Sequence, residues 1–166
     1  MAKEIERKFL LHANWKKQIA DENALLETIK IKQGYISTES GRSVRVRLST
    51  TNGVHTGFIT IKGPTKGITK PEFEYEIPVS DAREMLKTLC VGDIVEKTRY
   101  VYDTGDEDLS WEIDVFSGKN KGLVVAEIEV KRARQKFPIP SWLGVEVTGE
   151  KRYSNLNLSK TPYKLW

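Results

Sequence analysis

Apolar and charged residues alternate at every second position in segment after segment of this chain. At the start, Glu4, Glu6 and Lys8 alternate with the apolar Ile5 and Phe9. Successive side chains of a β-strand point to opposite faces, so a period of two predicts strands with one apolar and one charged face. Six later segments repeat the pattern, with polar or charged residues at Arg45 and Arg47, Thr60 and Lys62, Glu72, Glu74 and Glu76, Lys97 and Arg99, Glu112 and Asp114, and Glu127 and Glu129.

The charges within most of these segments have one sign, either acidic or basic. Two carboxylates at positions i and i+2 lie about 7 Å apart and repel by roughly 2.4 kcal/mol at a dielectric near 20, but by about 0.6 kcal/mol in water. On a solvated surface this sorting would have no consequence. In an enclosed space the acids would need a divalent cation such as Mg²⁺ or Mn²⁺, and the bases would need an anion. The sorting therefore favours a metal-bound chain of phosphates as the ligand.

Three helices are predicted, two between these segments and one after the last of them. The first follows Asn14, which we expect to cap it, and the second begins at Ser80, whose hydroxyl we also expect to act as the cap. A proline-rich break ending at Pro140 precedes a predicted last helix that carries Trp142 and Leu143. The helices are few beside the strands, so the class is α+β and mainly antiparallel β.

The strands can form either of two architectures. Strands with one apolar and one charged face usually make a sheet with one buried and one solvated side. The sorted charges favour instead an eight-stranded closed barrel with a charged lumen and helices that cover its apolar exterior. The pair Asn52-Gly53 predicts a hairpin between two of the strands. We expect a single domain over residues 1–166.

Composition restricts the classes of function. The 166 residues are 39% hydrophobic and 30% charged, as in soluble globular proteins, and no apolar run has the length of a membrane span. The single cysteine, Cys90, and a start without an apolar signal segment favour the cytoplasm. The net charge of +4 is spread along the chain, and the basic stretch 131–136 is typical of a solubilising loop, so nucleic acid is not an expected partner. His12 and His55 lack further ligands at the spacing of a zinc site.

The ordered motifs of the chain resemble those of the CYTH superfamily, the triphosphate tunnel metalloenzymes. The opening Glu4-x-Glu6-x-Lys8 is similar to the ExExK signature of that family, which alone would be unspecific. The complete ordered set, which covers nearly the whole chain, is highly specific. Its further members are Gln33-Gly-Tyr35, Arg45-x-Arg47, Thr60-Ile-Lys62, Glu72-x-Glu74, Glu96-Lys-Thr-Arg99-Tyr100, Glu112-x-Asp114-Val-Phe, Glu127-x-Glu129 and Glu146-Val-Thr-x-x-Lys151-Arg-Tyr153. The resemblance implies an eight-stranded antiparallel tunnel barrel.

The resemblance also implies a role for each charged set. The implied triphosphate ligands are Lys8, Arg45, Arg47, Lys62, Lys97 and Arg99. The implied ligands of Mg²⁺ or Mn²⁺ are Glu4, Glu6, Glu127 and Glu129, with Glu72, Glu74 and Asp114 as further or water-mediated ones. Lys8, Lys97 and Arg99 would stabilise the charge that develops as a phosphoanhydride bond breaks. Lys97 is either the base that activates water or only a phosphate ligand. Tyr35 would orient side chains in the lumen or be simply buried, and Lys151 would close over the distal phosphate or lie at the rim.

The compact length and the motifs EIERKFL, QGY and EKTRY look most like the small bacterial tripolyphosphatases. The implied activity is divalent-metal-dependent hydrolysis of inorganic tripolyphosphate. A class IV adenylate cyclase and a thiamine triphosphatase, which would act on a nucleoside or organic triphosphate, stay open as alternatives. A polyphosphate-binding module without turnover is less favoured, because it could dispense with the acids that are intact here. The oligomeric state is open between a monomer and a homodimer.

Overall fold

One antiparallel sheet dominates the computed structural model, which describes residues 5–39, 41–64, 71–132 and 134–166. The strands are β1 (Ile5–Leu11), β2 (Leu25–Ser37), β3 (Ser43–Thr51), β4 (Val54–Lys62), β5 (Glu72–Ile77), β6 (Val91–Asp103), β7 (Ser110–Phe116), β8 (Val124–Val130) and β9 (Leu143–Glu146). The helices are α1 (Trp15–Glu22), α2 (Val79–Thr88) and α3 (Asn155–Lys160), with the short 3-10 turns η1 (Gly118–Asn120), η2 (Lys151–Tyr153) and η3 (Tyr163–Leu165). The predicted class, mainly antiparallel β with few helices, is confirmed.

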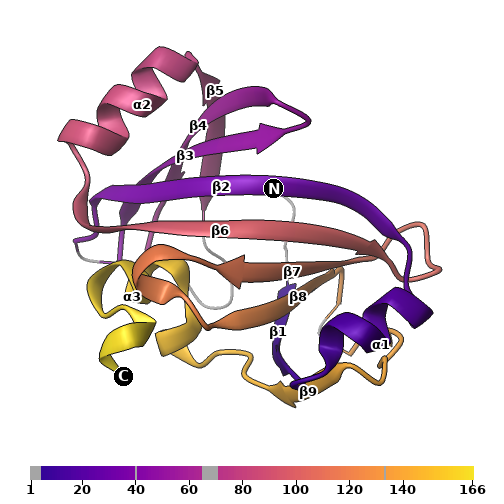
Figure 1. Ribbon diagram of the computed structural model, residues 1–166. Coiled ribbons are helices and arrows are strands. Elements are labelled where there is room, and N and C mark those ends of the chain that lie inside the picture. Colours follow the sequence, from indigo (N-terminus) through magenta and orange to yellow (C-terminus); the bar gives the residue numbers. More distant parts are fainter. Residues whose placement is uncertain (1–4, 40, 65–70, 133) are drawn as a thin grey trace.

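The sheet is open in the described part of the chain, and this differs from the predicted eight-stranded closed barrel. Its strand order is β5-β4-β3-β2-β6-β7-β8-β1-β9, so that β5 and β9 form the two edges. Closure would require β5 to pair with β1. The free side of β1 is instead paired with β9, a strand of four residues from the C-terminal part, with Phe9 opposite Glu146. Figure 1 shows β3–β5 turned away from the direction of β6–β8, so the open sheet is strongly twisted.

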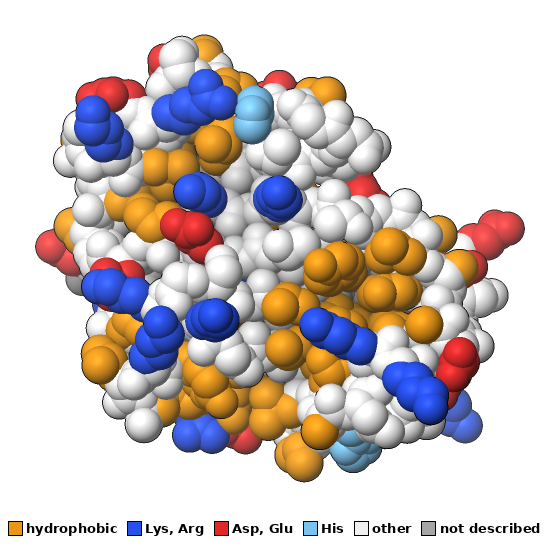
Figure 2. Space-filling view, viewed as in Figure 1, with side chains coloured by type: hydrophobic (Ala, Val, Ile, Leu, Met, Phe, Trp, Pro, Cys, Tyr) orange, Lys and Arg blue, Asp and Glu red, His pale blue; other side chains and the backbone are white. Residues whose placement is uncertain are grey.

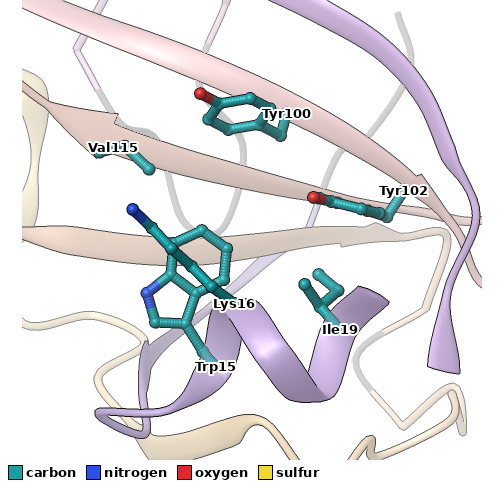
Figure 3. Close-up of a pocket in the computed structure, with 6 residues that line it drawn as sticks. All are labelled: Trp15, Lys16, Ile19, Tyr100, Tyr102 and Val115. Carbon is teal, nitrogen blue, oxygen red and sulfur yellow. The ribbon is translucent and has the colours of Figure 1, made fainter. Parts of the chain in front are cut away.

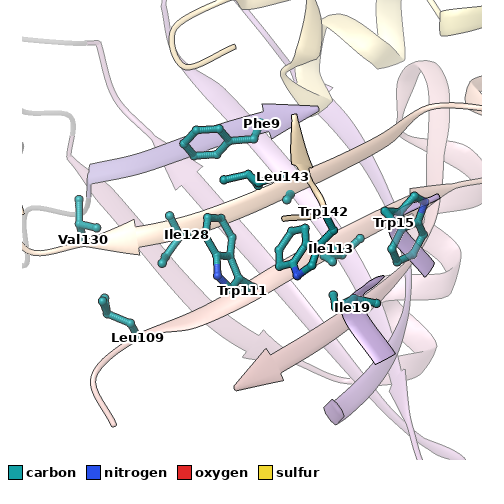
Figure 4. Close-up of a cluster of buried hydrophobic side chains, with 11 residues drawn as sticks. Phe9, Trp15, Ile19, Leu109, Trp111, Ile113, Ile128, Val130, Trp142 and Leu143 are labelled. Atoms are coloured by element: carbon teal, nitrogen blue, oxygen red, sulfur yellow. The ribbon is translucent and has the colours of Figure 1, made fainter. Parts of the chain in front are cut away.

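The side of the sheet that carries the apolar residues of β1, β7 and β8 forms the main core, here called the outer core (Figure 4). Helix α1 covers it with Trp15 and Ile19. Trp111 lies at its centre and makes edge contacts with Phe9 and Trp142, at ring-centroid distances of 5.9 and 5.2 Å. Because large aromatic side chains bury much apolar area, this core anchors the strands that carry charge on their other face.

The helix predictions are partly confirmed. Helix α1 follows Asn14 as expected, although the Asn14 side chain makes no capping hydrogen bond. Helix α2 begins at Val79, one residue before Ser80, and the Ser80 hydroxyl donates to Asp81 instead of capping. Pro78 holds the N-cap position with φ −52° and ψ 137°, and the helix begins without a side-chain cap.

The predicted helix with Trp142 and Leu143 is wrong. Leu143 begins β9, and Trp142 is fully buried in the outer core with its indole N–H donated to Asn23. The predicted hairpin at Asn52-Gly53 is confirmed, because both residues adopt positive φ between β3 and β4. No helix in the described residues is long and apolar enough to span a membrane.

Candidate functional site

Strand register places the charged residues singled out in the sequence on one face of the sheet. Residues directly opposite each other in neighbouring strands share a face. Lys8 lies opposite Glu127, which lies opposite Glu112. On the other half, Tyr35 lies opposite Arg45, and that row continues through Thr60 to Glu74. We call this side the charged face; its described members are Glu6, Lys8, Tyr35, Arg45, Arg47, Thr60, Lys62, Glu72, Glu74, Lys97, Arg99, Glu112, Asp114, Glu127 and Glu129.

The charged face lies on the inside of the curved sheet. In a flat sheet, Lys8 on β1 and Tyr35 on β2 would lie four strand spacings apart, or about 19 Å. Yet the charge of Lys8 acts on the Tyr35 hydroxyl and lowers its pKa, against a larger upward shift caused by burial. The sheet therefore curves enough to bring Lys8 of β1 toward Tyr35 of β2 on the charged face, even though its edges do not join.

The buried centre of this face is a cluster of Lys97, Asp114 and Arg99. Lys97 is 4% exposed and Asp114 is completely buried. The Lys97 ammonium pairs with Oδ2 of Asp114. Arg99 donates from Nε to Oδ1 at 2.7 Å and from a terminal nitrogen to Oδ2 at 2.8 Å. Asp114 is thus a shared counter-ion that fixes both cations, in the bidentate geometry that arginine favours.

Burial and charge shift the pKa values of this cluster in opposite ways. Burial lowers the pKa of Lys97, because the desolvated ammonium is disfavoured, and Asp114 offsets only part of this effect. Burial alone would raise the pKa of Asp114, but the charges of Lys97 and Arg99 hold it at about 2. The carboxylate is therefore ionised at neutral pH, and Lys97 gives up its proton more readily than a surface lysine.

A third cation, Lys8, lies next to this cluster. Its ammonium is 2.9 Å from Glu127 and 3.1 Å from Glu6. These two carboxylates raise the pKa of Lys8 although burial alone would lower it. Arg99 reaches the other oxygen of Glu127 at 3.1 Å and also pairs with Glu112. Three cations and their acids thus form one continuous network across β1, β6, β7 and β8.

A second cluster lies on β3, β4 and β5. Arg45 and Arg47 each approach one oxygen of Glu74 at 3.0 Å. The hydroxyl of Thr60 accepts a hydrogen bond from Arg45 at 2.9 Å and donates one to Glu74 at 2.7 Å. The Nε atoms of both arginines are buried and have no hydrogen-bond partner in the described residues. A buried donor without a partner is costly, so these two N–H groups indicate a place for an anion.

The other residues predicted for the site lie around these clusters. Lys62 pairs with Glu72 at 2.8 Å on the neighbouring strand. Tyr35 is buried and its hydroxyl accepts a long hydrogen bond of 3.4 Å from Gln33. Lys151 is exposed on η2, and the ion pairs of the two clusters do not include it. Glu129 is exposed on β8 opposite Glu6, and Glu4 lies outside the described residues.

An apolar plug bounds the charged face at one end. It consists of Leu10, Val95, Phe116, Leu123, Val125, Val147, Tyr153 and Leu158 with Tyr163 packed against them. Val95 precedes Lys97 by two residues and Phe116 follows Asp114 by two, so both continue the charged face. The Phe116 ring lies 5.6 Å from the Lys97 ammonium. The plug therefore excludes water from one side of the most buried cation.

Sequence reasoning did not assign a site role to Thr60 or to Phe116. The alternation with Lys62 placed Thr60 on the charged face, but an uncharged hydroxyl gave no sign of its link between Arg45 and Glu74. Phe116 carries no charge, and the sequence holds no sign that its strand runs from the charged face into the plug.

The charged groups form no ready-made metal cage in this arrangement. Among the described residues, no group of three or more His, Cys, Asp or Glu side chains is placed to hold a metal ion. The predicted ligands Glu6 and Glu129 lie opposite each other on β1 and β8, while Glu127 is occupied by Lys8 and Arg99. The donor set is purely carboxylate, and this is the chemistry that Mg²⁺ and Mn²⁺ prefer.

Comparison with known proteins identifies the family. The family model described as the CYTH domain matches residues 2–163. This chain belongs to the CYTH family. The CYTH chain is 43% identical to an inorganic triphosphatase of Acetivibrio thermocellus, with 99% of this chain and 97% of that protein covered. It is 36% identical to an inorganic triphosphatase of Nitrosomonas europaea, over 94% and 96% of the two chains.

A solved structure extends the likeness to the fold. The crystal structure of an inorganic triphosphatase matches with a TM-score of 0.64 and 33% identity, and covers 96% of this chain and 95% of its own. The resemblance inferred from the ordered motifs is confirmed.

Proposed function

We propose that this CYTH protein hydrolyses a phosphoanhydride bond of inorganic tripolyphosphate with the help of a divalent cation. The observation that carries the proposal is the pair of buried Nε groups on Arg45 and Arg47, which lack partners and lie on the same curved face as Lys97 and Arg99. Two relatives that match almost the full chain are inorganic triphosphatases, in agreement with the predicted activity.

The cations of the charged face suit a chain of phosphates. Arg45 and Arg47 would bind one phosphoryl group through their terminal nitrogens and Nε atoms, since planar guanidinium groups match phosphate oxygens in pairs. Lys97, Arg99 and Lys8 would bind the neighbouring phosphoryl groups of the substrate. Lys62 would bind a phosphoryl group further along the phosphate chain. Fixed positive charge at these points stabilises the negative charge that moves onto the leaving phosphate as the bond breaks. Such catalysis needs no covalent nucleophile.

The carboxylates of Glu6 on β1 and of Glu127 and Glu129 on β8, together with Glu4 outside the described residues, fit a divalent cation by their chemistry. Glu4, Glu6, Glu127 and Glu129 would hold the ion, with Glu72, Glu74 and Asp114 as further or water-mediated ligands. A bound Mg²⁺ or Mn²⁺ would supply charge neutralisation to the phosphates. Glu6 and Glu127 are paired with Lys8 in the described arrangement, so the ion would compete with that ammonium for the same oxygens.

Lys97 can serve in either of two roles, and both follow from its burial. As an ammonium it would bind a phosphoryl oxygen. As a neutral amine it would accept a proton from the attacking water, and its lowered pKa makes this form more accessible than in a surface lysine. The two roles differ in pH dependence, because a base requires the deprotonated form and a phosphate ligand requires the protonated one.

We also propose that residues 1–166 act as one domain in the cytoplasm, as a monomer or homodimer. The family match from residue 2 to 163 supports the single domain, and the single cysteine agrees with a cytoplasmic location.

The test measures phosphate release from tripolyphosphate, ATP and thiamine triphosphate in parallel, each with Mg²⁺, Mn²⁺ or a chelator. Cyclic AMP is measured in the ATP reactions. We expect metal-dependent hydrolysis of tripolyphosphate that is lost in Lys8→Ala and retained in the matched control Lys32→Ala. Lys32 has a 59% exposed side chain and lies on the opposite face of β2 from Tyr35. Cyclic AMP without tripolyphosphate hydrolysis would make the protein a cyclase. Metal-independent binding without turnover would make it a binding module.

A further inference from the structure

A groove lies behind the charged face, between helix α1 and the outer side of β6 and β7. It has a volume of about 320 Å³ and is lined by Trp15, Lys16, Ile19, Tyr100, Tyr102 and Val115 (Figure 3). Sites for small molecules commonly begin at this size. In Figure 2, hydrophobic side chains gather around a basic one over this part of the sheet, beside α1. The groove is thus part of an apolar surface that faces away from the charged clusters.

The polar groups of the groove point the same way along it. Figure 3 shows the Tyr100 hydroxyl and the Lys16 ammonium on the side where Val115 lies, and the Tyr102 hydroxyl directed toward them from the middle of the groove, whereas Ile19 lines the other end. The Lys16 ammonium also lies 5.8 Å from the centre of the Trp15 ring. The groove therefore has a cationic end, where Lys16 lies beside Trp15 and Val115, and an apolar end at Ile19.

These polar groups are not used to hold the fold together. Within the described ranges, neither tyrosine hydroxyl forms a hydrogen bond, and Lys16 forms no ion pair with an acid. Lys16 is the one charged residue among those that line the groove. An unopposed ammonium beside two free phenol groups offers several donors to an anion, and the aromatic rings offer surfaces for a flat apolar group.

We propose that this groove binds an aromatic ligand that carries an anionic group, of the class of nucleoside monophosphates. The base lies against the partly exposed ring of Tyr102, above a floor formed by the buried Trp15 and Ile19, and the phosphate accepts hydrogen bonds from Lys16 and the two hydroxyls. The site is separate from the charged face, because Tyr100 and Tyr102 alternate along β6 with residues of opposite orientation such as Arg99. Binding here does not depend on the proposed hydrolysis.

AMP is a suitable probe, because it has no phosphoanhydride bond and cannot be consumed by the proposed activity. Calorimetric titration of the full chain with AMP is carried out with and without saturating tripolyphosphate, in chelator. We expect binding that persists in the presence of tripolyphosphate, and at least about tenfold weaker binding of adenosine or inorganic phosphate alone. Displacement of AMP by tripolyphosphate would place it on the charged face and overturn the proposal.

Variants of the groove complete the test. Lys16→Glu should weaken AMP binding at least about tenfold, since an attractive charge becomes a repulsive one. The matched control is Lys17→Glu, which makes the same charge change at the next exposed position, outside the groove lining. It should leave binding within about twofold of the parent. Tyr102→Phe, which keeps the ring, should weaken binding by a smaller factor than Lys16→Glu. Equal affinities in Lys16→Glu and Lys17→Glu, or no binding of AMP, would refute the site.

Discussion

Removal of the charge on Asp114 tests whether this residue is the fixed counter-ion of the site. Asparagine has nearly the same shape, so Asp114→Asn creates no cavity but leaves Lys97 buried beside a neutral amide. Asp114 is completely buried and accepts two hydrogen bonds from Arg99 in addition to its contact with Lys97. Breaking a buried ion pair by removing one partner costs about 3–5 kcal/mol. This is a large part of the roughly 5–15 kcal/mol by which domains are typically stable.

The assay is urea unfolding followed by tryptophan fluorescence, in chelator and without phosphate. Glu112→Gln is the matched control, because Glu112 also pairs with Arg99 but its side chain is 37% exposed. We expect the control to lose less than about 1 kcal/mol. In a double-mutant cycle with Lys97→Met, the combined loss should be smaller than the sum of the single losses by about 1–3 kcal/mol. A loss in Asp114→Asn no greater than in Glu112→Gln would refute the role of Asp114 as counter-ion.

Three further predictions concern the same face. The low pKa of Asp114, about 2, means that its stabilising charge is fully present above its ordinary pKa and is lost as the pH falls through about 2. Unfolding measured between pH 4 and 2 should therefore show a fall in stability of roughly 2 kcal/mol that Asp114→Asn lacks. Thr60→Val should raise the KM for tripolyphosphate about three- to tenfold, because Arg45 and Glu74 lose a shared hydrogen-bond partner. Thr60→Ser, which keeps the hydroxyl, should have the KM of the parent. An unchanged KM in Thr60→Val would contradict this prediction. If Lys97 acts as the base, kcat should rise with pH to a plateau and Lys97→Met should abolish that rise; if it acts as a phosphate ligand, kcat should fall at high pH.

The alternation of charge along each segment predicted which side chains share the charged face. The period of two assigned Lys8, Arg45, Asp114 and Glu127 to one face, and the strand register bears this out. This prediction worked because the side-chain period of a strand is a local property of the backbone. It does not depend on which strands become neighbours.

Properties that depend on strand neighbours could not be read in this way. Closure of the barrel was predicted from the sorting of charges by sign along the strands. The free edge of β1 is instead paired with β9. Nothing local marks Leu143–Glu146 as a strand, since four residues after a proline-rich break can equally begin a helix. Its conformation depends on pairing with β1 through Phe9, a contact more than 130 residues away in sequence.

The sorting of charge by sign also has a different meaning in three dimensions. Along each strand the acids stand together, but across strands they meet bases: Glu127 contacts Lys8 and Arg99, and Glu74 contacts Arg45 and Arg47. Much of the repulsion between acids along each strand is therefore neutralised within the protein, without a bound ion. What still indicates an anion is more specific, namely the arginine Nε atoms that remain buried without partners.

The two acidic partners on this face differ in how readily they can be exchanged for phosphate. Asp114 is completely buried. If it separated from Lys97 and Arg99, its carboxylate would be unpaired and without water, which is strongly unfavourable. Glu74 has a side chain that is 35% exposed, so it can turn into solvent at small cost and release both arginines. A phosphate chain should therefore displace Glu74 from Arg45 and Arg47 while Asp114 keeps Arg99 and Lys97 in place. One cluster is thus suited to capture substrate, and the other to hold the cations that act on it in a fixed geometry.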